Sequence, residues 1–268
     1  MSRVAVAGIS GRMGTLVAEA LDAAPDLELV VGIDPVGAPT SLAARGSRRD
    51  AVPVVASFAE ALPFGVEVLV DFTVAPAARE TVAAALRASV SVVLGTSGLS
   101  SGDLSEFEAL ATASEVGCFY APNFALGAVL LVRFAAQAAR YFPGVEVVEL
   151  HHDRKVDAPS GTARHTVERL AAARAEAGLE APSDATTTVA WEGARGATGP
   201  GGIHVHSVRL PSLLAHEEVL LSGPGELLTL RHDSFGRSSF MGGVLLAVRE
   251  VQRCSGLVVG LDQLLDQQ

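Results

Sequence analysis

The stretch Gly8-Ile9-Ser10-Gly11-Arg12-Met13-Gly14 decides the fold of the first half of the chain. It follows a short β-rich run, Arg3 to Ala7, and precedes a helical pattern that reaches Ala24 and is closed by Pro25. Glycines three apart between a strand and a helix permit a tight turn, and they let the backbone approach a pyrophosphate at the helix N-terminus. The pattern therefore favours a dinucleotide-binding unit over a merely structural turn.

An acidic residue closes the next strand. The buried run Leu27 to Ile33 ends at Asp34, which lies 20 residues after Gly14. A carboxylate there accepts hydrogen bonds from the adenosine ribose hydroxyls and repels a 2′-phosphate. No Lys or Arg follows until Arg45, and Arg12 is the nearest group that could offset the repulsion. NADH is therefore expected to serve at least as well as NADPH, although a firm preference stays open.

Strands and helices continue to alternate after Asp34. Strand-like runs cover Val66 to Phe72, Val90 to Leu94 and Cys118 to Ala121, with Ala-rich helical patterns between them. This order predicts an α/β, Rossmann-like, doubly wound parallel sheet, in which the carboxyl ends of all strands meet at one rim where ligands bind. Ordinary turn chemistry remains an alternative for 95–97 and 122–123. The rim gives the candidate cofactor-binding residues Gly8, Ile9, Ser10, Gly11, Arg12, Met13, Asp34, Phe72, Gly95, Thr96, Ser97, Ala121, Pro122, Asn123 and Phe124.

The composition excludes several other classes of protein. A chain of 268 residues with 49% hydrophobic residues can form one large or two modest domains. A formal net charge of -10 argues against nucleic acid as a partner. Cys118 and Cys254 are too few and too isolated for a disulfide framework or a zinc site, so no metal is expected. With no leader pattern and no apolar run of membrane-spanning length, a cytoplasmic location is expected.

A second chemically distinctive stretch runs from Val148 through His151, His152 and Lys155 to Thr162. Of the 20 Lys and Arg residues in the chain, Lys155 is the single lysine. Arginine stays protonated at any working pH, whereas a desolvated ammonium group can lose its proton. Lys155 is therefore a candidate proton donor. The strand Val145 to Leu150 delivers the two adjacent histidines to opposite faces, so at most one of them needs to share a pocket with Lys155.

The end of that stretch has the chemistry of a helix start. Ser160, Gly161 and Thr162 precede an Ala-, Arg- and Glu-rich segment that favours a helix from Ala163 to Ala177. Small residues and free backbone N–H groups at a helix N-terminus bind anions. The stretch thus combines two imidazoles, an ammonium group and an anion site. The alternative is a solvated basic loop followed by a capped helix.

The remainder predicts a second domain with α+β architecture and an open mixed sheet. Strand-like runs cover Ile203 to Leu210, Glu217 to Ser222 and Glu226 to His232, with a further possible strand from Thr186 to Trp191. Short glycine-containing connections favour antiparallel pairing. The exposed face of such a sheet needs a cover, which an oligomer would provide. The histidines of this region are expected to be exposed strand residues rather than ligands: His204, His206, His216 and His232.

The domain boundaries follow from these patterns. An apolar helix, Phe240 to Val251, is expected to pack back on the first domain. The predicted dinucleotide-binding domain is 1–124 with 237–268, and 125–236 is the predicted substrate-binding and oligomerisation domain.

Taken together, the motifs resemble the 4-hydroxy-tetrahydrodipicolinate reductase (dihydrodipicolinate reductase) family of bacterial diaminopimelate and lysine biosynthesis. The resemblance extends over nearly the whole chain, and its most specific part is Glu149 through His151-His152 and Lys155 to Ala163. It implies a homotetramer and a dicarboxylate substrate. It also implies His151 and Lys155 as the catalytic pair, with His152, Ser160, Gly161 and Thr162 on the substrate.

The implied reaction is the NAD(P)H-dependent reduction of 4-hydroxy-tetrahydrodipicolinate to tetrahydrodipicolinate with loss of water. Because coupled groups titrate as a unit, the sequence does not decide whether His151 or Lys155 gives up the proton. Two alternatives remain open at this point. One is another NAD(P)-linked dehydrogenase of amino-acid metabolism, and the other is a non-enzymatic dinucleotide-sensing regulator. Neither would be expected to carry the stretch from His151 to Thr162. Two departures from the family pattern, Ser97 and the connection Ser222 to Gly225, bear on fine specificity.

Overall fold

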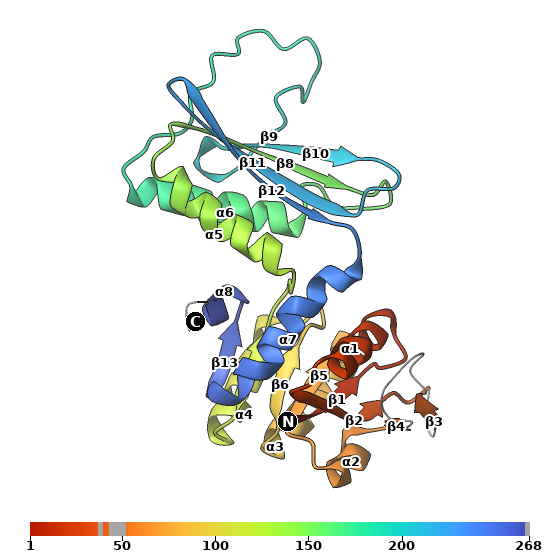
Figure 1. Cartoon of the computed structure of the whole chain (residues 1–268). Coiled ribbons are helices and arrows are strands. Elements are labelled where there is room, and N and C mark those ends of the chain that lie inside the picture. Colours follow the sequence, from red (N-terminus) through yellow and green to blue (C-terminus); the bar gives the residue numbers. More distant parts are fainter. Residues whose placement is uncertain (37–39, 43–51, 266–268) are drawn as a thin grey trace. The chain divides into compact units, whose positions relative to one another are not determined.

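The computed structural model describes residues 1–36, 40–42 and 52–265, and Arg45 lies outside this part of the chain (Figure 1). The chain divides into two compact units, each with its own sheet. Unit 1 comprises Met1–Leu126 with Arg237–Gln268, and unit 2 comprises Gly127–Gly236. Among the described residues, no helix combines the length and the apolar character that crossing a bilayer would require.

Unit 1 is built on an eight-stranded sheet in the order β13-β7-β6-β5-β1-β2-β4-β3. Every neighbouring pair is parallel except β3 with β4, which confirms the predicted doubly wound parallel sheet. The strands are β1 (Ser2–Ala7), β2 (Leu27–Ile33), β3 (Thr40–Leu42), β4 (Val52–Val55), β5 (Val68–Asp71), β6 (Ser91–Leu94), β7 (Gly117–Tyr120) and β13 (Gly256–Val259).

Helices cover both faces of this sheet (Figure 1). Helices α2, α3 and α4 pack on one face, where Phe58, Val82 and Phe107 join strand residues in a single core. Helices α1 and α7 contact each other, so α7, which matches the apolar helix predicted from Phe240 to Val251, packs on unit 1. The helical elements are α1 (Arg12–Ala23), α2 (Phe58–Ala61), α3 (Ala75–Arg87), α4 (Ser101–Ala113), α7 (Met241–Glu250), α8 (Asp262–Leu265) and the 3₁₀ turns Leu62–Phe64, Arg237–Phe240 and Val251–Arg253.

Local sequence explains most of these elements. The central strands β5 and β6 are buried along their whole length, as expected for parallel strands covered on both faces. Helix α4 begins with a capping box, in which Ser100 accepts from the Asp103 N–H and the Asp103 carboxylate accepts from the Ser100 N–H. The sequence patterns did not predict β4 or β13. Both are four residues long; β4 pairs with β2 and β3, and β13 pairs with β7.

Unit 2 contains a five-stranded mixed sheet in the order β12-β11-β8-β10-β9. The pair β10–β8 is parallel and the other pairs are antiparallel, which confirms the predicted mixed sheet. Helices α5 and α6 pack on one face, with Val147, Val167 and Val219 in their shared core (Figure 1). The elements are α5 (Leu126–Ala139), β8 (Gly144–His151), α6 (Gly161–Glu176), β9 (Ala197–Thr198), the 3₁₀ turn Pro200–Gly202, β10 (His204–Arg209), β11 (Ala215–Gly223) and β12 (Glu226–Ser234).

The structure corrects two expectations in this unit. Residues 186–191 form no strand, because Val189 and Trp191 are exposed and no neighbouring strand pairs with them. The four histidines are not exposed strand residues. His216 is buried against Asp233, and His204 and His206 are partly buried and contact Asp184 and Glu146. His232 packs over Gly127 and is partly buried. The strand pattern placed these histidines on strands correctly. It could not show that carboxylates from other segments contact and partly bury them.

Candidate active site

The glycine-rich turn of unit 1 leaves no room for a side chain at positions 8 and 14. Gly8 has φ +73, and a Cβ added to it would lie 3.1 Å from the Phe72 carbonyl oxygen. A Cβ on Gly14 would lie 2.1 Å from the Gly8 carbonyl oxygen, an impossible distance. The turn therefore brings the backbone of β1, α1 and the loop after β5 together at the carboxyl edge of the sheet. This close approach of backbone to the helix start is what a dinucleotide pyrophosphate requires.

Asp34 lies directly beside that turn. Its side chain accepts hydrogen bonds from the Ser10 N–H at 3.1 Å and from the Val36 N–H at 3.0 Å. The carboxylate is therefore held at the end of β2, adjacent to the first helix turn. This is the place in which an acidic residue contacts the ribose of a bound dinucleotide.

An open cavity of about 550 Å³ lies at the same edge. Two guanidinium groups line it, Arg12 from the predicted motif and Arg237 from the segment after unit 2. The sequence analysis did not assign Arg237 to this site, because the residue is distant in sequence and no local motif marks it. The cavity residues are Ser10, Gly11, Arg12, Thr15, Leu16, Arg237 and Ser238.

Two further loops complete the rim of unit 1. The Phe72 ring covers Gly95 so closely that a Cβ there would be 2.1 Å from the ring, and Phe72 also lies 5.6 Å from the Phe124 ring. The fully buried Asp71 accepts hydrogen bonds from the hydroxyls of Thr73 and Thr96, at 2.8 Å and 2.7 Å. Burial raises the pKa of Asp71. These contacts fix the loops after β5 and β6 against each other.

The other predicted cofactor residues lie at this rim in different ways. The side chains of Ile9, Thr96, Ala121 and Phe124 are buried, so they shape the rim from beneath. Arg12, Ser97 and Pro122 are exposed. Asn123 accepts a hydrogen bond from the Ala125 N–H at 2.9 Å, which orders the loop after β7. The predicted residues of unit 1 thus lie at one edge of the sheet. Some have exposed side chains, and others are buried and pack beneath the exposed ones.

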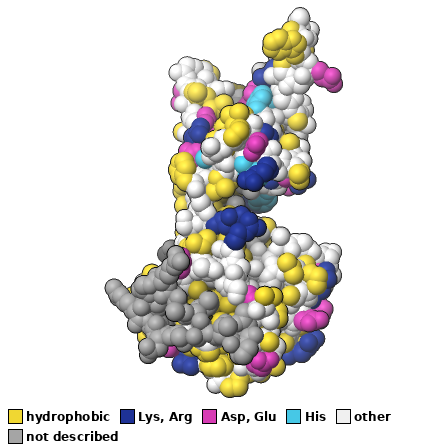
Figure 2. Space-filling view, turned by 90° about the vertical axis from the view of Figure 1, so that its right-hand side faces the viewer, with side chains coloured by type: hydrophobic (Ala, Val, Ile, Leu, Met, Phe, Trp, Pro, Cys, Tyr) yellow, Lys and Arg dark blue, Asp and Glu magenta, His cyan; other side chains and the backbone are white. Residues whose placement is uncertain are grey.

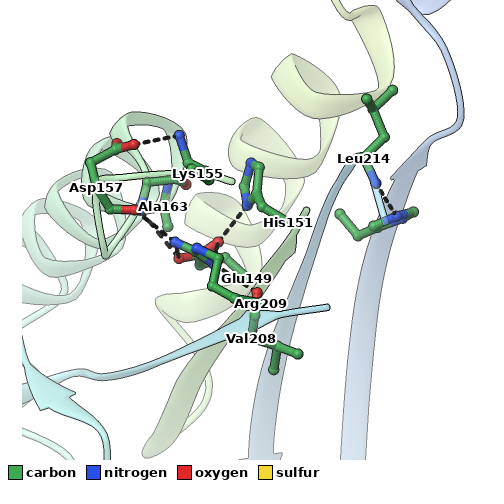
Figure 3. Close-up of polar contacts among 10 residues, drawn as sticks. Glu149, His151, Lys155, Asp157, Ala163, Val208, Arg209 and Leu214 are labelled. Atoms are coloured by element: carbon green, nitrogen blue, oxygen red, sulfur yellow. Dashed lines mark hydrogen bonds and ion pairs between the residues drawn. The ribbon is translucent and has the colours of Figure 1, made fainter. Parts of the chain in front are cut away.

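In unit 2, the predicted catalytic residues lie at the end of β8 and in the turn that follows. His151 is the last residue of the strand, and the Lys155 N–H donates to the His152 carbonyl oxygen across the turn. The Lys155 ammonium group is 2.7 Å from the Asp157 carboxylate, and its side chain is 21% exposed. Figure 3 shows Lys155 turned toward Asp157, close to the His151 ring. The Lys155 hydrogen bond is the main cause of the lowered pKa of Asp157.

A buried carboxylate lies beneath these residues. Glu149 is fully buried and is 2.5 Å from the His151 Nδ1 atom. Arg209 donates two hydrogen bonds to the same carboxylate, at 2.9 Å and 2.7 Å (Figure 3). Burial opposes ionisation of Glu149, but hydrogen bonds from Arg209, Ser207 and His151 outweigh it and lower its pKa. Burial is also the main cause of the lowered pKa of His151, partly offset by Glu149.

The predicted anion site is the N-terminus of α6. Ser160 is the buried N-cap, and its hydroxyl accepts from the Ala163 N–H at 3.1 Å. A Cβ added to Gly161 would meet little, with Arg164 the nearest group at 4.0 Å. The first turn of this 16-residue helix is therefore open to a small anion. His152 adds a buried Nδ1 atom that has no hydrogen-bond partner within the described residues.

Charged side chains also lie on the surface of unit 2 (Figure 2). Figure 2 shows histidine side chains interspersed with Lys or Arg and with Asp or Glu side chains on one face of the unit. No cluster of three or more His, Cys, Asp or Glu side chains suited to a metal occurs among residues 1–36, 40–42 and 52–265.

The sequence analysis assigned no role to several of the residues just described. Glu149 belongs to the family motif, but local sequence does not distinguish its carboxylate from that of any other strand residue. Arg209, Glu217 and Asp71 gave no local signal, since an isolated charged residue in a strand is normally solvated. The apolar residues on either side of Asp71 and Glu217 in the sequence indicate that these two carboxyl groups are buried. They do not indicate which residues bind them.

The fold and the two sites define a class of protein. A doubly wound parallel sheet with a glycine-rich turn and a strand-end aspartate is typical of oxidoreductases that use a nicotinamide dinucleotide. Unit 2 adds paired histidines, a lysine and an open helix N-terminus. Two family descriptions match the chain: "Dihydrodipicolinate reductase, N-terminus" over residues 2–124, and "Dihydrodipicolinate reductase, C-terminus" over residues 127–265. The chain therefore belongs to the dihydrodipicolinate reductase family.

Similar proteins support this assignment over the full length. The chain is 49% identical to the 4-hydroxy-tetrahydrodipicolinate reductase of Beutenbergia cavernae, covering 98% of each chain. It is 46% identical to the enzyme of the same name from Cutibacterium acnes, covering 99% of each chain. A solved structure, dipicolinate-bound dihydrodipicolinate reductase from Paenisporosarcina sp. TG-14, superposes with a TM-score of 0.85 at 39% identity, over 98% of this chain and 99% of that one.

Proposed function

We propose that this chain catalyses the NAD(P)H-dependent reduction of 4-hydroxy-tetrahydrodipicolinate to tetrahydrodipicolinate, with release of water, in diaminopimelate and lysine biosynthesis. The observation that carries the proposal is the membership of both units in one reductase family. Full-length similarity to reductases favours this function over another NAD(P)-linked dehydrogenase and over a dinucleotide-sensing regulator.

The proposed cofactor site is the rim of unit 1, and 1–124 with 237–268 is the proposed dinucleotide-binding domain. The backbone N–H groups at the start of α1 would bind the pyrophosphate, and Asp34 would bind the adenosine ribose. When bound, the nicotinamide supplies the hydride. We propose that NADH serves at least as well as NADPH, because Asp34 disfavours a 2′-phosphate. Arg12 and Arg237 line the adjacent cavity and lessen this discrimination.

The proposed substrate site lies in unit 2, within 125–236. The N–H groups of Gly161 and Thr162, with the Ser160 cap, would hold one carboxylate at the N-terminus of α6. His152 would contact a second polar group of the substrate, since its Nδ1 atom is buried and has no hydrogen-bond partner within the described residues. A dicarboxylate is the ligand class that fits an open helix N-terminus bordered by imidazoles and Arg164.

His151 and Lys155 are the proposed catalytic pair. Loss of the substrate hydroxyl group as water gives a conjugated imine, and reduction of that imine by hydride leaves an enamine carbon that must take a proton. Lys155 lies on the turn after β8, partly shielded from solvent, and Asp157 holds its ammonium group. His151 is oriented by Glu149, so that its Nε2 atom is free to exchange a proton with a bound molecule. We propose that the two groups act as a coupled acid–base pair in delivering this proton.

The assay that tests this function is direct. Substrate is generated in place by dihydrodipicolinate synthase, and oxidation of NADH is followed at the nicotinamide absorbance. We expect synthase-dependent NADH oxidation that is inhibited by dipicolinate. NADH oxidation that does not depend on the synthase product would contradict the proposal.

The cofactor assignment makes a separate prediction. Asp34→Ala should raise KM for NADH by roughly 10- to 100-fold, the usual effect of losing a hydrogen bond to a charged group, and should change KM for NADPH much less. The turnover number at saturating cofactor should change little. Matched measurements of both cofactors with wild type and variant decide the point. If turnover falls while both KM values hold, Asp34 does not bind the ribose.

We also propose a homotetramer formed through the unit 2 sheet. Helices α5 and α6 cover one face of this sheet, and apolar side chains such as Val148, Leu220 and the exposed Leu227 lie on the other. An open mixed sheet with such a face is commonly covered by another subunit. Light scattering of the purified chain should give four times the mass of 27.5 kDa.

A further inference from the structure

A second buried carboxylate lies beside Glu149. Strands β8 and β11 pair antiparallel, and Glu217 lies directly opposite Glu149 in that register. Both side chains point to the face covered by α6, and both are buried. Two carboxylates in one buried layer repel each other strongly if both are charged, so their surroundings must give them different charge states.

The partners of Glu149 fix it as an anion. Arg209 binds it through two hydrogen bonds, and His151 Nδ1 and the Ser160 N–H contact the same carboxylate at 2.5 Å and 3.3 Å. Arg209 also donates to the Asp157 carbonyl oxygen at 2.8 Å. One buried charge therefore connects the imidazole, the N-cap of α6 and the turn that carries Lys155.

Hydrogen counting indicates the opposite state for Glu217. The Thr166 hydroxyl is 3.1 Å from the Thr162 carbonyl oxygen and 2.5 Å from a Glu217 oxygen. A hydroxyl has one hydrogen, and a carbonyl oxygen only accepts. Both contacts can be hydrogen bonds at the same time only if Thr166 donates to the helix carbonyl and Glu217 donates to Thr166, which requires a protonated carboxyl group. No cation contributes to the pKa shift of Glu217. Burial, together with the charge of the neighbouring Glu149, raises the pKa of Glu217 to about 7.

We propose that ionised Glu149 is the positioning residue for His151 and the α6 N-terminus, and that protonated Glu217 keeps the negative charge of the pair on Glu149. The neutral His151 ring then carries its proton on Nδ1, donated to Glu149, and presents the Nε2 lone pair away from the sheet. Loss of the Glu149 charge frees the ring to flip or change tautomer. This inference rests on the proposed function only for its kinetic consequence.

Three full-length variants test the pair. Glu149→Gln should lower kcat 10- to 100-fold while KM for NADH changes less than threefold, because its amide can neither fix the tautomer nor neutralise Arg209. Glu217→Gln replaces a neutral acid by a neutral amide and should leave kcat within threefold. Glu146→Gln is the matched control, since Glu146 also contacts a histidine and an arginine, His206 and Arg195, but from the other face of β8.

A readout without substrate separates this inference from the proposed function. In protein labelled with ¹⁵N-histidine, long-range ¹H–¹⁵N spectra report the tautomer and pKa of each ring, and His151→Gln assigns the His151 signals. Wild type should show the Nδ1–H tautomer. Glu149→Gln should lower the pKa of His151, because that ring then faces Arg209 and Lys155 without the carboxylate that offsets them. Glu149→Asp, which keeps the charge, should restore the tautomer in part.

The outcomes are distinct. An Nε2–H tautomer in the wild type overturns the positioning role, even if Glu149→Gln fails to fold. An equal loss of kcat in Glu217→Gln and Glu149→Gln overturns the assignment of charge states, as does a ¹³C signal showing Glu217 ionised at pH 6. If no variant and no wild-type sample reduces the substrate while the tautomer is as expected, the proposed function fails and the positioning role stands.

Discussion

The two faces of β8 carry nearly the same chemical groups in different surroundings. On the face covered by α6, Glu149 contacts His151 and Arg209. On the other face, Glu146 contacts His206 and Arg195. Glu149 is fully buried, whereas the Glu146 side chain is 31% exposed. The same three residue types therefore form a buried network on one face and a partly exposed ion-pair network on the other.

The comparison teaches that connections matter as much as residue types. Glu149 is linked to the N-cap of α6 and, through Arg209, to the turn that carries Lys155. Glu146 is linked to the loop of residues 184–195 through Arg195, which also contacts Asp184. The first network connects residues with acid–base chemistry to the start of α6, and the second connects β8 to a surface loop. Partly exposed pairs of the second kind contribute little to stability, typically below about 1 kcal/mol.

The largest effect is expected on the face of β8 that is covered by α6, where the proposed catalytic pair lies. Lys155→Ala should lower kcat by roughly 10²–10⁴, the usual range for a general acid, with little change in cofactor affinity. His206→Gln, on the other face, should leave kcat within about twofold. Steady-state kinetics of both variants measure the contrast. Lys155→Arg keeps the charge but cannot release a proton at working pH, so near-normal turnover in that variant would reduce Lys155 to an electrostatic role.

The next effect is a pH dependence of stability that belongs to the buried face. The pKa of Glu217 is raised from 4.5 to about 7 in the folded state. Between these values the folded chain holds a proton that the unfolded chain has lost, so the free energy of unfolding falls as pH rises. The full change is roughly 3 kcal/mol, because each pKa unit corresponds to about 1.4 kcal/mol. This contribution is fully present below about pH 4.5 and lost above about pH 7.

Urea unfolding at pH 5 and pH 7.5 measures this contribution. Glu217→Gln should remove it, whereas Glu146→Gln should leave it in place. The difference between wild type and variant isolates Glu217 from other titrating groups such as His151. An unchanged pH dependence in Glu217→Gln would show that the carboxyl group is not protonated in the folded chain.

The smallest effect concerns Asp157, the exposed partner of Lys155. Asp157 pairs with Lys155, but its side chain is 45% exposed. Asp157→Asn should therefore lower kcat only about twofold to fivefold, the range that an exposed ion pair supports. The difference in kcat between the wild type and Asp157→Asn should diminish at high salt, because salt screens an exposed ion pair. The wild type measured at the same salt concentrations is the control. A loss as large as that of Lys155→Ala would mean that Asp157 does more than hold the ammonium group.

Sequence predicted the rim of unit 1 well because parallel strands place their carboxyl ends together. The glycine turn, Asp34 and the loops after β5, β6 and β7 could be assigned to one edge from strand order alone. Arg237 could not, because it returns to this edge from the far end of unit 2. In unit 2, Lys155, His151 and Ser160 are close in sequence and were found together. The histidines of β10 and β11 were misjudged, since their carboxylate partners lie on other segments.

By itself, the sequence determined the two chemical centres of this protein: a glycine-rich turn followed by an acidic strand end, and a stretch that combines histidines, a single lysine and a helix start. These follow from local spacing and side-chain chemistry. Only the tertiary structure decided how the second centre is held. Arg209 is 60 residues from Glu149, and Glu217 meets it through the β8–β11 register. The charge state of a buried carboxyl group depends on the residues that strand pairing brings next to it, and strand pairing is a property of the fold.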